Sequence, residues 1–393
     1  MAVIDYQNKA PGVYIEEITP AGPIAGVGTS TPAFVGKVKK SDATANEPVM
    51  ITNWTQYVEK FEGYESTAKN DIYMPHAVRA FFDNGGTKLY VVPVTAATGG
   101  TTPAALDLTV ALGNLEKVQD VSMVCAPGIT DATAQKAVVT HCENMTNRFA
   151  ILDGKLDDDS KKAIDAVKTQ VAGVKSTKGY AALYFPWITI GDPTSKVDPR
   201  PPLAVPPSGY IAGIYARSDA ERGVHKAPAN EIVRGALDLS YLLGDTEQGI
   251  LNKAGINALR VFPGGPPVVW GARTTTADTA WRYVNVRRLF IYVEESIKQG
   301  IRWAMFEPNN YALWKKLERT ITEFLDRVWR AGALFGKTAQ EAFYVRIDEE
   351  LNPPAARALG EVYIEIGMAP VRPAEFIVVR IGMWEGGSQV IEG

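Results

Sequence analysis

The feature of this chain that most constrains its fold is a regular alternation between residues 121 and 188. Short apolar runs predict buried strands, and the longer segments between them have helical composition. A strand-helix-strand-helix-strand order implies a parallel sheet with right-handed crossovers. The predicted elements are a strand over 121–125, a helix over 131–144 capped by Asp131, a strand over 149–152, a helix over 157–174 and a strand over 180–185.

Apolar runs outside this region predict the rest of a mixed α/β (α+β) fold. The segment Pro263-Gly-Gly-Pro-Pro267 separates two of these runs, which is typical of a hairpin. Six prolines between residues 191 and 210 exclude a helix or a central strand there and predict a long ordered loop or linker. Further strands are predicted near 13–18, 33–38, 88–94, 256–262, 268–270, 342–347, 362–366 and 376–381, and a further helix over 75–82.

Two amphipathic helices are predicted in the last third of the chain. The first, over residues 281–297, has a 3-4-3-4 apolar spacing that defines one face. A strand over 301–306 is predicted to follow it, and then a second helix over 310–334. The apolar face of the first helix comprises Tyr283, Val286, Phe290, Val293 and Ile297, and that of the second comprises Trp314, Leu317, Ile321, Phe324 and Val328.

Composition excludes several classes of protein. The net charge of −3 argues against a nucleic-acid binder. No apolar run approaches the ~18 residues of a membrane span, and the start of the chain lacks the pattern of a signal peptide. The two cysteines, Cys125 and Cys142, form neither a disulfide framework nor a metal-ligand cluster, so two buried thiols are expected.

Two motifs are similar to enzyme signatures but occur in the wrong context. The segment Gly332-Ala-Leu-Phe-Gly336-Lys337-Thr338 is similar to a phosphate-binding loop, yet it is one residue short and follows a long helix. A helix C-cap is the simpler interpretation. Gly28-Thr29-Ser30 is similar to the serine motif of subtilisin-like proteases, but it precedes every histidine that could act as its base.

Two acidic features could also suggest a site. Asp153 ends a predicted parallel strand, where α/β enzymes place functional groups. However, Asp153-Gly154 is also an ordinary turn pair, which we favour. The run Asp157-Asp158-Asp159 could suggest a cation site, but acidic residues in the first turn of a helix are explained by the helix dipole alone. We therefore expect no catalytic residues, no cofactor and no metal.

Several motifs, in a fixed order along the chain, carry a resemblance to a known family. Besides the two amphipathic helices with Phe306-Glu-Pro-Asn-Asn310, they span most of the sequence. The chain resembles contractile tail sheath proteins of phage tails and phage-tail-like injection systems. The motifs are Pro11-Gly-Val-Tyr-Ile-Glu-Glu17, Gly28-Thr-Ser-Thr-Pro-Ala-Phe-Val-Gly36, Ala80-Phe-Phe-Asp-Asn-Gly-Gly86, Val205-Pro-Pro-Ser-Gly209, Gly223-Val-His-Lys-Ala-Pro-Ala-Asn230 and Val371-Arg-Pro-Ala-Glu-Phe376.

The resemblance implies a structural subunit rather than an enzyme. Such subunits form stacked hexameric rings around an inner tail tube, and their contraction drives the tube through a target envelope. The implied partners are further copies of this chain, the inner tube protein, and baseplate and terminal cap proteins, with no nucleic acid and no direct membrane insertion. Assembly is expected in the bacterial cytoplasm, in a phage tail or a released tail-like particle. The alternatives are an α/β hydrolase-like enzyme and a non-contractile shell or assembly protein.

At 393 residues the chain exceeds a usual single core, so about two or three domains are expected. The expected divisions are an N-terminal linking arm over 1–20, an N-terminal part of the sheath body over 21–94, an α/β outer domain over 95–210 with its proline-rich loop at 191–210, a C-terminal inner core domain over 211–372 and a C-terminal linking arm over 373–393.

Two sets of residues are expected to make contacts within the assembly. Short β-prone segments in the two arms are expected to link neighbouring subunits by strand exchange. These are Val13, Tyr14 and Ile15, and Phe376, Ile377, Val378 and Val379. The resemblance also implies that an inner helix contacts the tube. Residues 310–334 include five basic and three acidic side chains. The five basic residues, Lys315, Lys316, Arg319, Arg327 and Arg330, are expected to face the tube.

Overall fold

The computed structural model describes residues 23–39, 45–64, 72–94, 108–156 and 160–380. Its first core is built on a mixed sheet of nine strands in the order β2-β3-β1-β4-β5-β6-β11-β12-β9. The six strands from β3 to β11 run parallel, and an antiparallel strand or pair extends each end. The strands are β1 Pro32–Gly36, β2 Val49–Ile51, β3 Leu89–Pro93, β4 Met123–Cys125, β5 Phe149–Asp153, β6 Ala181–Phe185, β9 Glu231–Ile232, β11 Ile256–Val261 and β12 Pro267–Val269.

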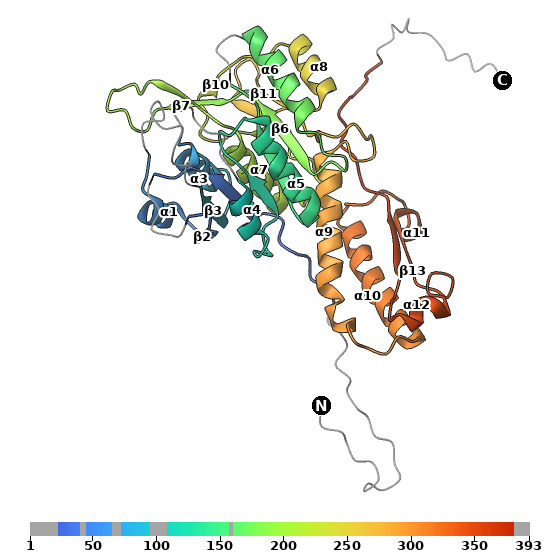
Figure 1. The fold of residues 1–393 in the computed structure, drawn as a ribbon. Coiled ribbons are helices and arrows are strands. Elements are labelled where there is room, and N and C mark those ends of the chain that lie inside the picture. Colours follow the sequence, from blue (N-terminus) through green and yellow to red (C-terminus); the bar gives the residue numbers. More distant parts are fainter. Residues whose placement is uncertain (1–22, 40–44, 65–71, 95–107, 157–159, 381–393) are drawn as a thin grey trace, which may run out of the picture.

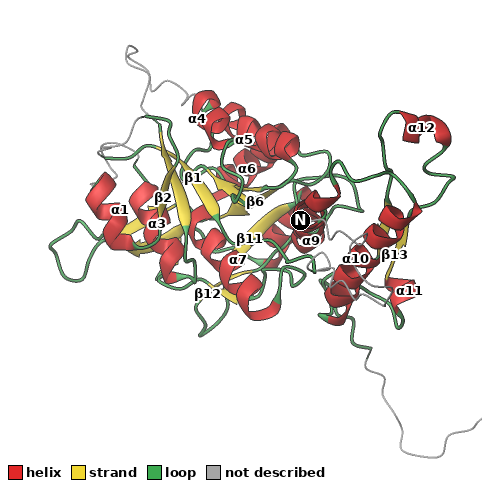
Figure 2. Cartoon of the chain, turned by 90° about the horizontal axis from the view of Figure 1, so that it is seen from below, coloured by secondary structure: helices red, strands yellow, loops and turns green. Residues whose placement is uncertain are grey.

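Helices cover both faces of this sheet (Figures 1 and 2). One face carries α4 Thr109–Leu115, α5 Ala132–Met145, α6 Ser160–Gly173 and, beside α6, α8 Asp245–Ala254. The other carries α1 Trp54–Phe61, α3 Met74–Asp83 and α7 Ser208–Arg222. Since both faces are covered, the parallel strands are mostly apolar, and β1, β5 and β6 are buried at every residue.

Helix α7 packs closely on α3 because two of its glycines face that helix. A Cβ atom at Gly209 would lie 2.4 Å from the Cα of Ala77, and one at Gly213 would lie 2.6 Å from the carbonyl oxygen of Phe81. No side chain of α7 caps its N-terminus. The buried carboxylate of Asp153, at the end of β5, instead accepts hydrogen bonds from the Ser208 amide (2.7 Å) and hydroxyl (2.9 Å).

A smaller core forms beside the first one from the C-terminal part of the chain. Helix α9, Val284–Gly300, and helix α10, Tyr311–Arg330, pack against a two-stranded antiparallel sheet of β13, Phe343–Arg346, and β14, Glu365–Met368. The short helices α11, Ala339–Ala342, and α12, Pro354–Ala358, complete this part. All five residues of the predicted apolar face of α10 are buried, Ile321, Phe324 and Val328 in this core and Trp314 and Leu317 in a small separate cluster with Leu313 and Ile347.

A small third sheet projects from the first core. It pairs β7, Ile188–Gly191, with β8, Pro202–Val205, and with β10, Asp238–Leu239. The predicted proline-rich loop at 191–210 therefore contains an edge strand, and its last residues begin α7. Prolines are compatible with β8 because this strand lies at the edge of its sheet.

The predicted α/β alternation, the hairpin of β11 and β12, and both amphipathic helices are confirmed, and with them the mixed α/β fold class. The strand predicted over 301–306 is wrong. The Ile301 amide donates to the Ile297 carbonyl, so the helical path continues into a short 3-10 helix over Arg302–Ala304. The second amphipathic helix ends at Arg330 rather than at 334, because Gly332 adopts a left-handed conformation with φ of 83°.

Two other terminal predictions differ from the structure or lie outside it. Residues 376–380 form no strand within the described part of the chain. The strand predicted over 362–366 is shifted to Glu365–Met368. Val13, Tyr14, Ile15 and the acidic run 157–159 lie outside the described residues.

The expected domain divisions at residues 94 and 210 stay a prediction. One sheet takes strands from the segments 21–94, 95–210 and 211–372 alike. The second core begins only with α9, which contributes buried residues to both cores: Val284 and Ile291 to the first, and Leu289, Val293 and Ile297 to the second.

The close packing of α7 on α3 predicts opposite effects for two helical glycines. Gly213→Ala should destabilise the chain by ~1–3 kcal/mol, because the new methyl group would overlap the backbone of α3. Gly249→Ala in α8 is the matched control, since nothing lies within 4 Å of the place that its new methyl group would occupy. That change should stabilise the helix by ~0.5–1 kcal/mol. Urea unfolding of both variants measures the difference, and equal effects would contradict the proposed contact.

Candidate assembly interface

A buried ion pair joins the two cores to the N-terminal segment. The Arg288 guanidinium on α9 donates to both carboxylate oxygens of Asp219 on α7, at 2.8 Å and 2.5 Å. The two side chains are only 4% and 5% exposed. Arg288 also donates to the Thr29 carbonyl (3.0 Å), and the Thr29 hydroxyl donates to Asp219 (2.6 Å). Every oxygen of the buried carboxylate therefore has a donor, which is what such a pair needs to be stable.

The described start of the chain, residues 23–31, runs along α9. The Val27 amide donates to the Ser296 hydroxyl (3.1 Å), and the Arg327 guanidinium of α10 donates to the Ile24 carbonyl (2.6 Å). Ile24 is buried against Gly300, where a Cβ atom would lie 2.6 Å from the Ile24 side chain. These contacts fix the root of the N-terminal arm on the C-terminal half of α9.

The root of the C-terminal arm is fixed near the other end of α9. Backbone hydrogen bonds join it to the segment after α10, from Phe335 to Ala369 (2.7 Å) and from Val371 to Ala333 (3.2 Å). The Asn285 side-chain amide donates to the Val371 carbonyl (3.1 Å) and to the His225 carbonyl (2.8 Å). Both arm roots are therefore held by one helix.

A cluster around Glu375 ends this anchored segment. Arg273 donates to both Glu375 oxygens, at 2.8 Å and 2.7 Å. The Asn252 amide and the Tyr283 hydroxyl each donate to the same carboxylate at 3.0 Å. Burial alone would raise the pKa of Glu375, but these hydrogen bonds and the charge of Arg273 outweigh it and hold the pKa below its ordinary value. Glu375 is therefore ionised and paired at neutral pH.

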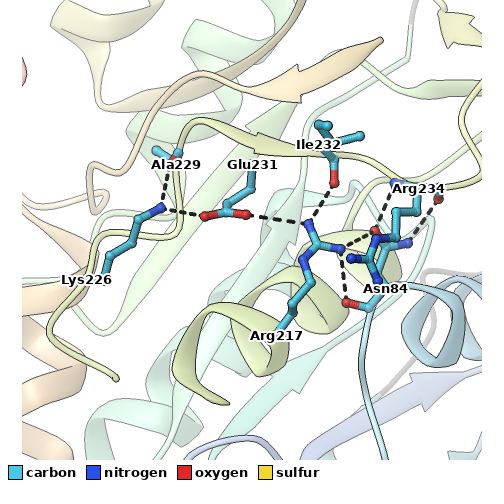
Figure 3. A network of polar contacts seen from close by, with 7 residues as sticks. All are labelled: Asn84, Arg217, Lys226, Ala229, Glu231, Ile232 and Arg234. Atoms are coloured by element: carbon cyan, nitrogen blue, oxygen red, sulfur yellow. Dashed lines mark hydrogen bonds and ion pairs between the residues drawn. The ribbon is translucent and has the colours of Figure 1, made fainter. Parts of the chain in front are cut away.

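A second polar network positions the loop of residues 223–234, which lies against the C-terminal arm root (Figure 3). Arg217 of α7 donates to the Ile232 carbonyl (2.8 Å), and Lys226 pairs with Glu231 (2.6 Å). Asn84, just after α3, exchanges two hydrogen bonds of 3.0 Å with the Arg234 backbone. The network fixes the loop that presents the His225 carbonyl to Asn285.

The chain beyond Glu375 carries four exposed apolar residues in a row. Phe376, Ile377, Val378 and Val379 are 73–82% exposed. Isolated surface apolar residues are normal, but a β-prone run of four marks an interaction site. The predicted arm residues of the C-terminus are thus available for contact with another chain.

A groove on the second core offers a complementary apolar surface. It lies between α9 and β14 and has a volume of about 690 Å³. The two-stranded sheet beside it has two outer edges that pair with no strand among the described residues. Edge strands with free backbone groups accept a further strand readily. The apolar residues of the groove are Phe290, Val293, Ile297, Ile301, Met305, Ile366 and Met368.

The five expected tube-facing residues do not share one environment. Arg319 is exposed on α10. Lys315 and Arg330 are exposed too and form short-range pairs with Glu318 (2.7 Å) and Asp326 (2.7 Å). Arg327 is exposed as well, but its guanidinium donates to the Ile24 carbonyl, and half-buried Lys316 lies over the Trp303 ring.

The motifs that could suggest enzyme chemistry have structural contacts. Asp153 is 1% exposed and binds the Gly128 amide (2.9 Å) besides Ser208, so no substrate can reach it. Burial raises its pKa to about 6 against these hydrogen bonds. Gly332 belongs to the C-terminal turn of α10 rather than to a phosphate loop. Within the described ranges, His, Cys, Asp and Glu form no group of three or more that could hold a metal.

None of the described helices is both long enough and apolar enough to cross a membrane.

Two family models match the chain: the phage tail sheath protein central domain over residues 101–275, and the phage tail sheath C-terminal domain over 276–383. This chain belongs to the phage tail sheath family. The two models meet between residues 275 and 276, shortly before α9.

Solved structures support the same assignment along nearly the whole sheath chain. A chain of the anti-feeding prophage baseplate is 33% identical, with a TM-score of 0.75, and the match covers 95% of this chain and 99% of that one. A chain of the contracted sheath complex of the PVC extracellular contractile injection system is 30% identical, with a TM-score of 0.79 and coverage of 96% and 98%.

A curated relative is more distant. The prophage major tail sheath protein of Pseudomonas aeruginosa strain UCBPP-PA14 is 27% identical over 266 residues. That match covers 64% of this chain and 62% of the relative. The relatives are structural sheath proteins, which confirms the expectation of a structural protein rather than an enzyme, and nothing among them favours a hydrolase or a non-contractile shell.

Sequence analysis did not single out the residues that anchor the arms. Asp219, Arg273, Arg288 and Glu375 are charged, and no spacing rule distinguishes a buried ion pair from an exposed one. Only an indirect signal existed, since three of the motifs that carried the resemblance lie at the arm roots: 28–36 with Thr29, 223–230 with His225, and 371–376 with Glu375.

The buried ion pair predicts a large effect for one carboxylate and a small effect for another. Asp219→Asn should destabilise the chain by ~3–5 kcal/mol, because Arg288 would keep its charge in a buried site without a counter-charge. Asp326→Asn, which breaks the exposed pair with Arg330, should cost less than ~1 kcal/mol. Denaturant unfolding compares them, and equal losses would show that the Arg288 pair does not join the cores.

Proposed function

We propose that this chain is the repeating subunit of a contractile sheath. Its copies form stacked six-fold rings around an inner tube, and contraction of the sheath drives the tube through a target envelope. The observation that carries the proposal is the likeness to a chain of a contracted sheath complex over 96% of this chain and 98% of that one. The energy for contraction comes from the metastable packing of the assembled rings, without nucleotide hydrolysis.

The same proposal defines the partners. They are further copies of this chain, the inner tube protein, and baseplate and terminal cap proteins. The likeness to a chain of an injection-system baseplate supports an association with a baseplate. Assembly takes place in the bacterial cytoplasm, and the subunit binds no nucleic acid and does not insert into a membrane.

Within the assembly, the terminal arms link neighbouring subunits by strand exchange. Three features support this: the exposed apolar run 376–379, the two open edges of the β13–β14 sheet, and the apolar groove beside β14. A strand of a second copy that pairs with β14 would place alternate side chains on the groove. Its backbone hydrogen bonds contribute ~0.5–1.5 kcal/mol each, and repetition around a ring raises their effective concentration.

The exposed basic residues of α10 contact the inner tube. Arg319, Lys315 and Arg330 lie on the helix face that points away from the buried apolar stripe. Exposed ion pairs are individually weak, at ~0–1 kcal/mol, which suits a contact that holds before contraction and releases during it. Lys316 and Arg327 support this face from within the subunit.

Deletion of either arm tests the link. Removal of residues 1–18 or of residues 376–393 should leave a folded subunit, because all the described anchoring contacts lie between residues 24 and 375. Neither deletion should form hollow cylinders, which negative-stain electron microscopy measures. Phe335→Ser is the matched control, since it removes an exposed apolar residue outside the arms. Normal cylinders from both truncated chains would contradict the strand exchange.

Charge reversal tests the tube contact. Lys315, Arg319 and Arg330 changed together to Glu should leave the melting temperature within a few degrees of wild type and reduce the yield of tube-filled particles about tenfold or more. The control reverses three exposed lysines of the first core, Lys168, Lys175 and Lys253. The contact would be assigned wrongly if the α10 variant assembled on tubes as well as this control does.

A further inference from the structure

The anchored part of the C-terminal arm ends abruptly at one residue. Up to Val371 the segment is held by backbone hydrogen bonds to residues 333–335 and by Asn285. At Glu375 four hydrogen bonds converge on one carboxylate. From Phe376 onward the side chains are exposed, and no hydrogen bond joins residues 376–380 to the rest of the described chain.

We propose that Glu375 is a latch that holds the root of the C-terminal arm on the body, so that the free length of the arm begins at residue 376. The proposal rests on the proposed sheath function for its biological meaning. With the latch closed, the arm leaves the body at residue 376. An open latch adds the four residues from Arg372 to Glu375 and changes the direction in which the arm leaves the subunit.

The residues that bind Glu375 come from three separate parts of the fold, so the latch depends on how these parts are arranged. Asn252 lies at the end of α8, Arg273 follows β12, and Tyr283 immediately precedes α9. Arg273 is held in turn by the Asn252 carbonyl (2.9 Å) and by the side chain of Asn257 on β11, which accepts from the Arg273 amide (2.6 Å). The latch therefore joins the edge of the large sheet to the arm that contacts a neighbour.

The surroundings of the Glu375 carboxylate also allow the latch to open. Glu375 and Arg273 are 19% and 14% exposed, and Glu375 lines an open cavity of about 550 Å³. Water can enter this cavity, so a released carboxylate would be hydrated rather than stranded in an apolar site. By contrast, the Arg288–Asp219 pair is almost completely buried and cannot open in this way.

Spin-label distances in the unassembled subunit test the latch. One label is placed at Lys168 on α6 and the other at exposed Ala374 or Val378, because native Cys125 and Cys142 are buried. In the wild-type background the 374 distance should be narrow and the 378 distance broad. Glu375→Ala should raise the population of displaced 374 labels about tenfold or more, because hydrogen bonds to a charged group are lost.

Further variants separate a latch from general loosening. Arg273→Gln should act like Glu375→Ala, and the double variant should add little, since the two residues share one interaction. Tyr283→Phe removes one donor and should give an intermediate effect, which keeps the test informative if the stronger variants fold poorly. Arg372→Ala, an exposed change on the same segment, should have no effect.

Two results would overturn the proposal: a 374 distance that stays narrow in Glu375→Ala, or a 378 distance as narrow as the 374 distance in the wild-type background. These measurements use the free subunit. Failure of wild-type chains to form cylinders would therefore count against the sheath function, while the label distances would still decide whether Glu375 holds the arm.

Discussion

The bidentate pair of Arg288 and Asp219 is the interaction on which the rest of the structure depends. It lies where α7 of the first core, α9 and the N-terminal segment meet, and it is nearly inaccessible to water. A buried pair of this kind adds little net stability over apolar packing, but its loss is costly because one charge would remain unpaired. Its contribution is therefore geometric, since it allows one arrangement of three segments and penalises others.

That arrangement explains why α9 is buried on more than one side. Leu289, Val293 and Ile297 pack with residues of α10 in the second core, while Val284 and Ile291 pack in the first core. Arg287 is buried as well, where it stacks on the Trp281 ring at 3.5 Å and donates to the Lys178 carbonyl. Helix α9 is thus packed between the two cores rather than on the surface, and the two cores cannot move apart without exposing paired charges.

Sequence patterns predicted the elements whose environment is simple. The strands β4, β5 and β6 are short apolar runs between helices, and α10 has one apolar stripe. In these elements the apolar positions in the sequence are also the buried positions in the structure. Helix α7 was missed because it is buried nearly all round, contains glycines where α3 approaches, and is capped by Asp153 from a distant strand. None of these features leaves a local signal.

Contacts between residues far apart in the sequence also limited the prediction of the candidate interface. The exposed run 376–379 was correctly singled out as apolar and β-prone, and its use as a linking strand stays a prediction. The two anchoring ion pairs, Asp219–Arg288 and Arg273–Glu375, join residues that are 69 and 102 positions apart in the chain. On α10, Arg319 and Arg327 are both exposed, and the helical period could not show that Arg327 donates to the Ile24 carbonyl.

The placement of both arm roots on α9 has a mechanical consequence. Asn285 holds one root and Ser296 and Gly300 lie against the other, so the two attachment points are separated by roughly 20 Å along a single helix. If neighbouring subunits are joined through these arms, one neighbour pulls on one end of α9 and another neighbour pulls on the other end. The tensile force between them is then transmitted along the axis of this helix. Because Val284, Ile291 and Arg288 of α9 also contact the first core, such a force would reach the nine-stranded sheet through these side chains.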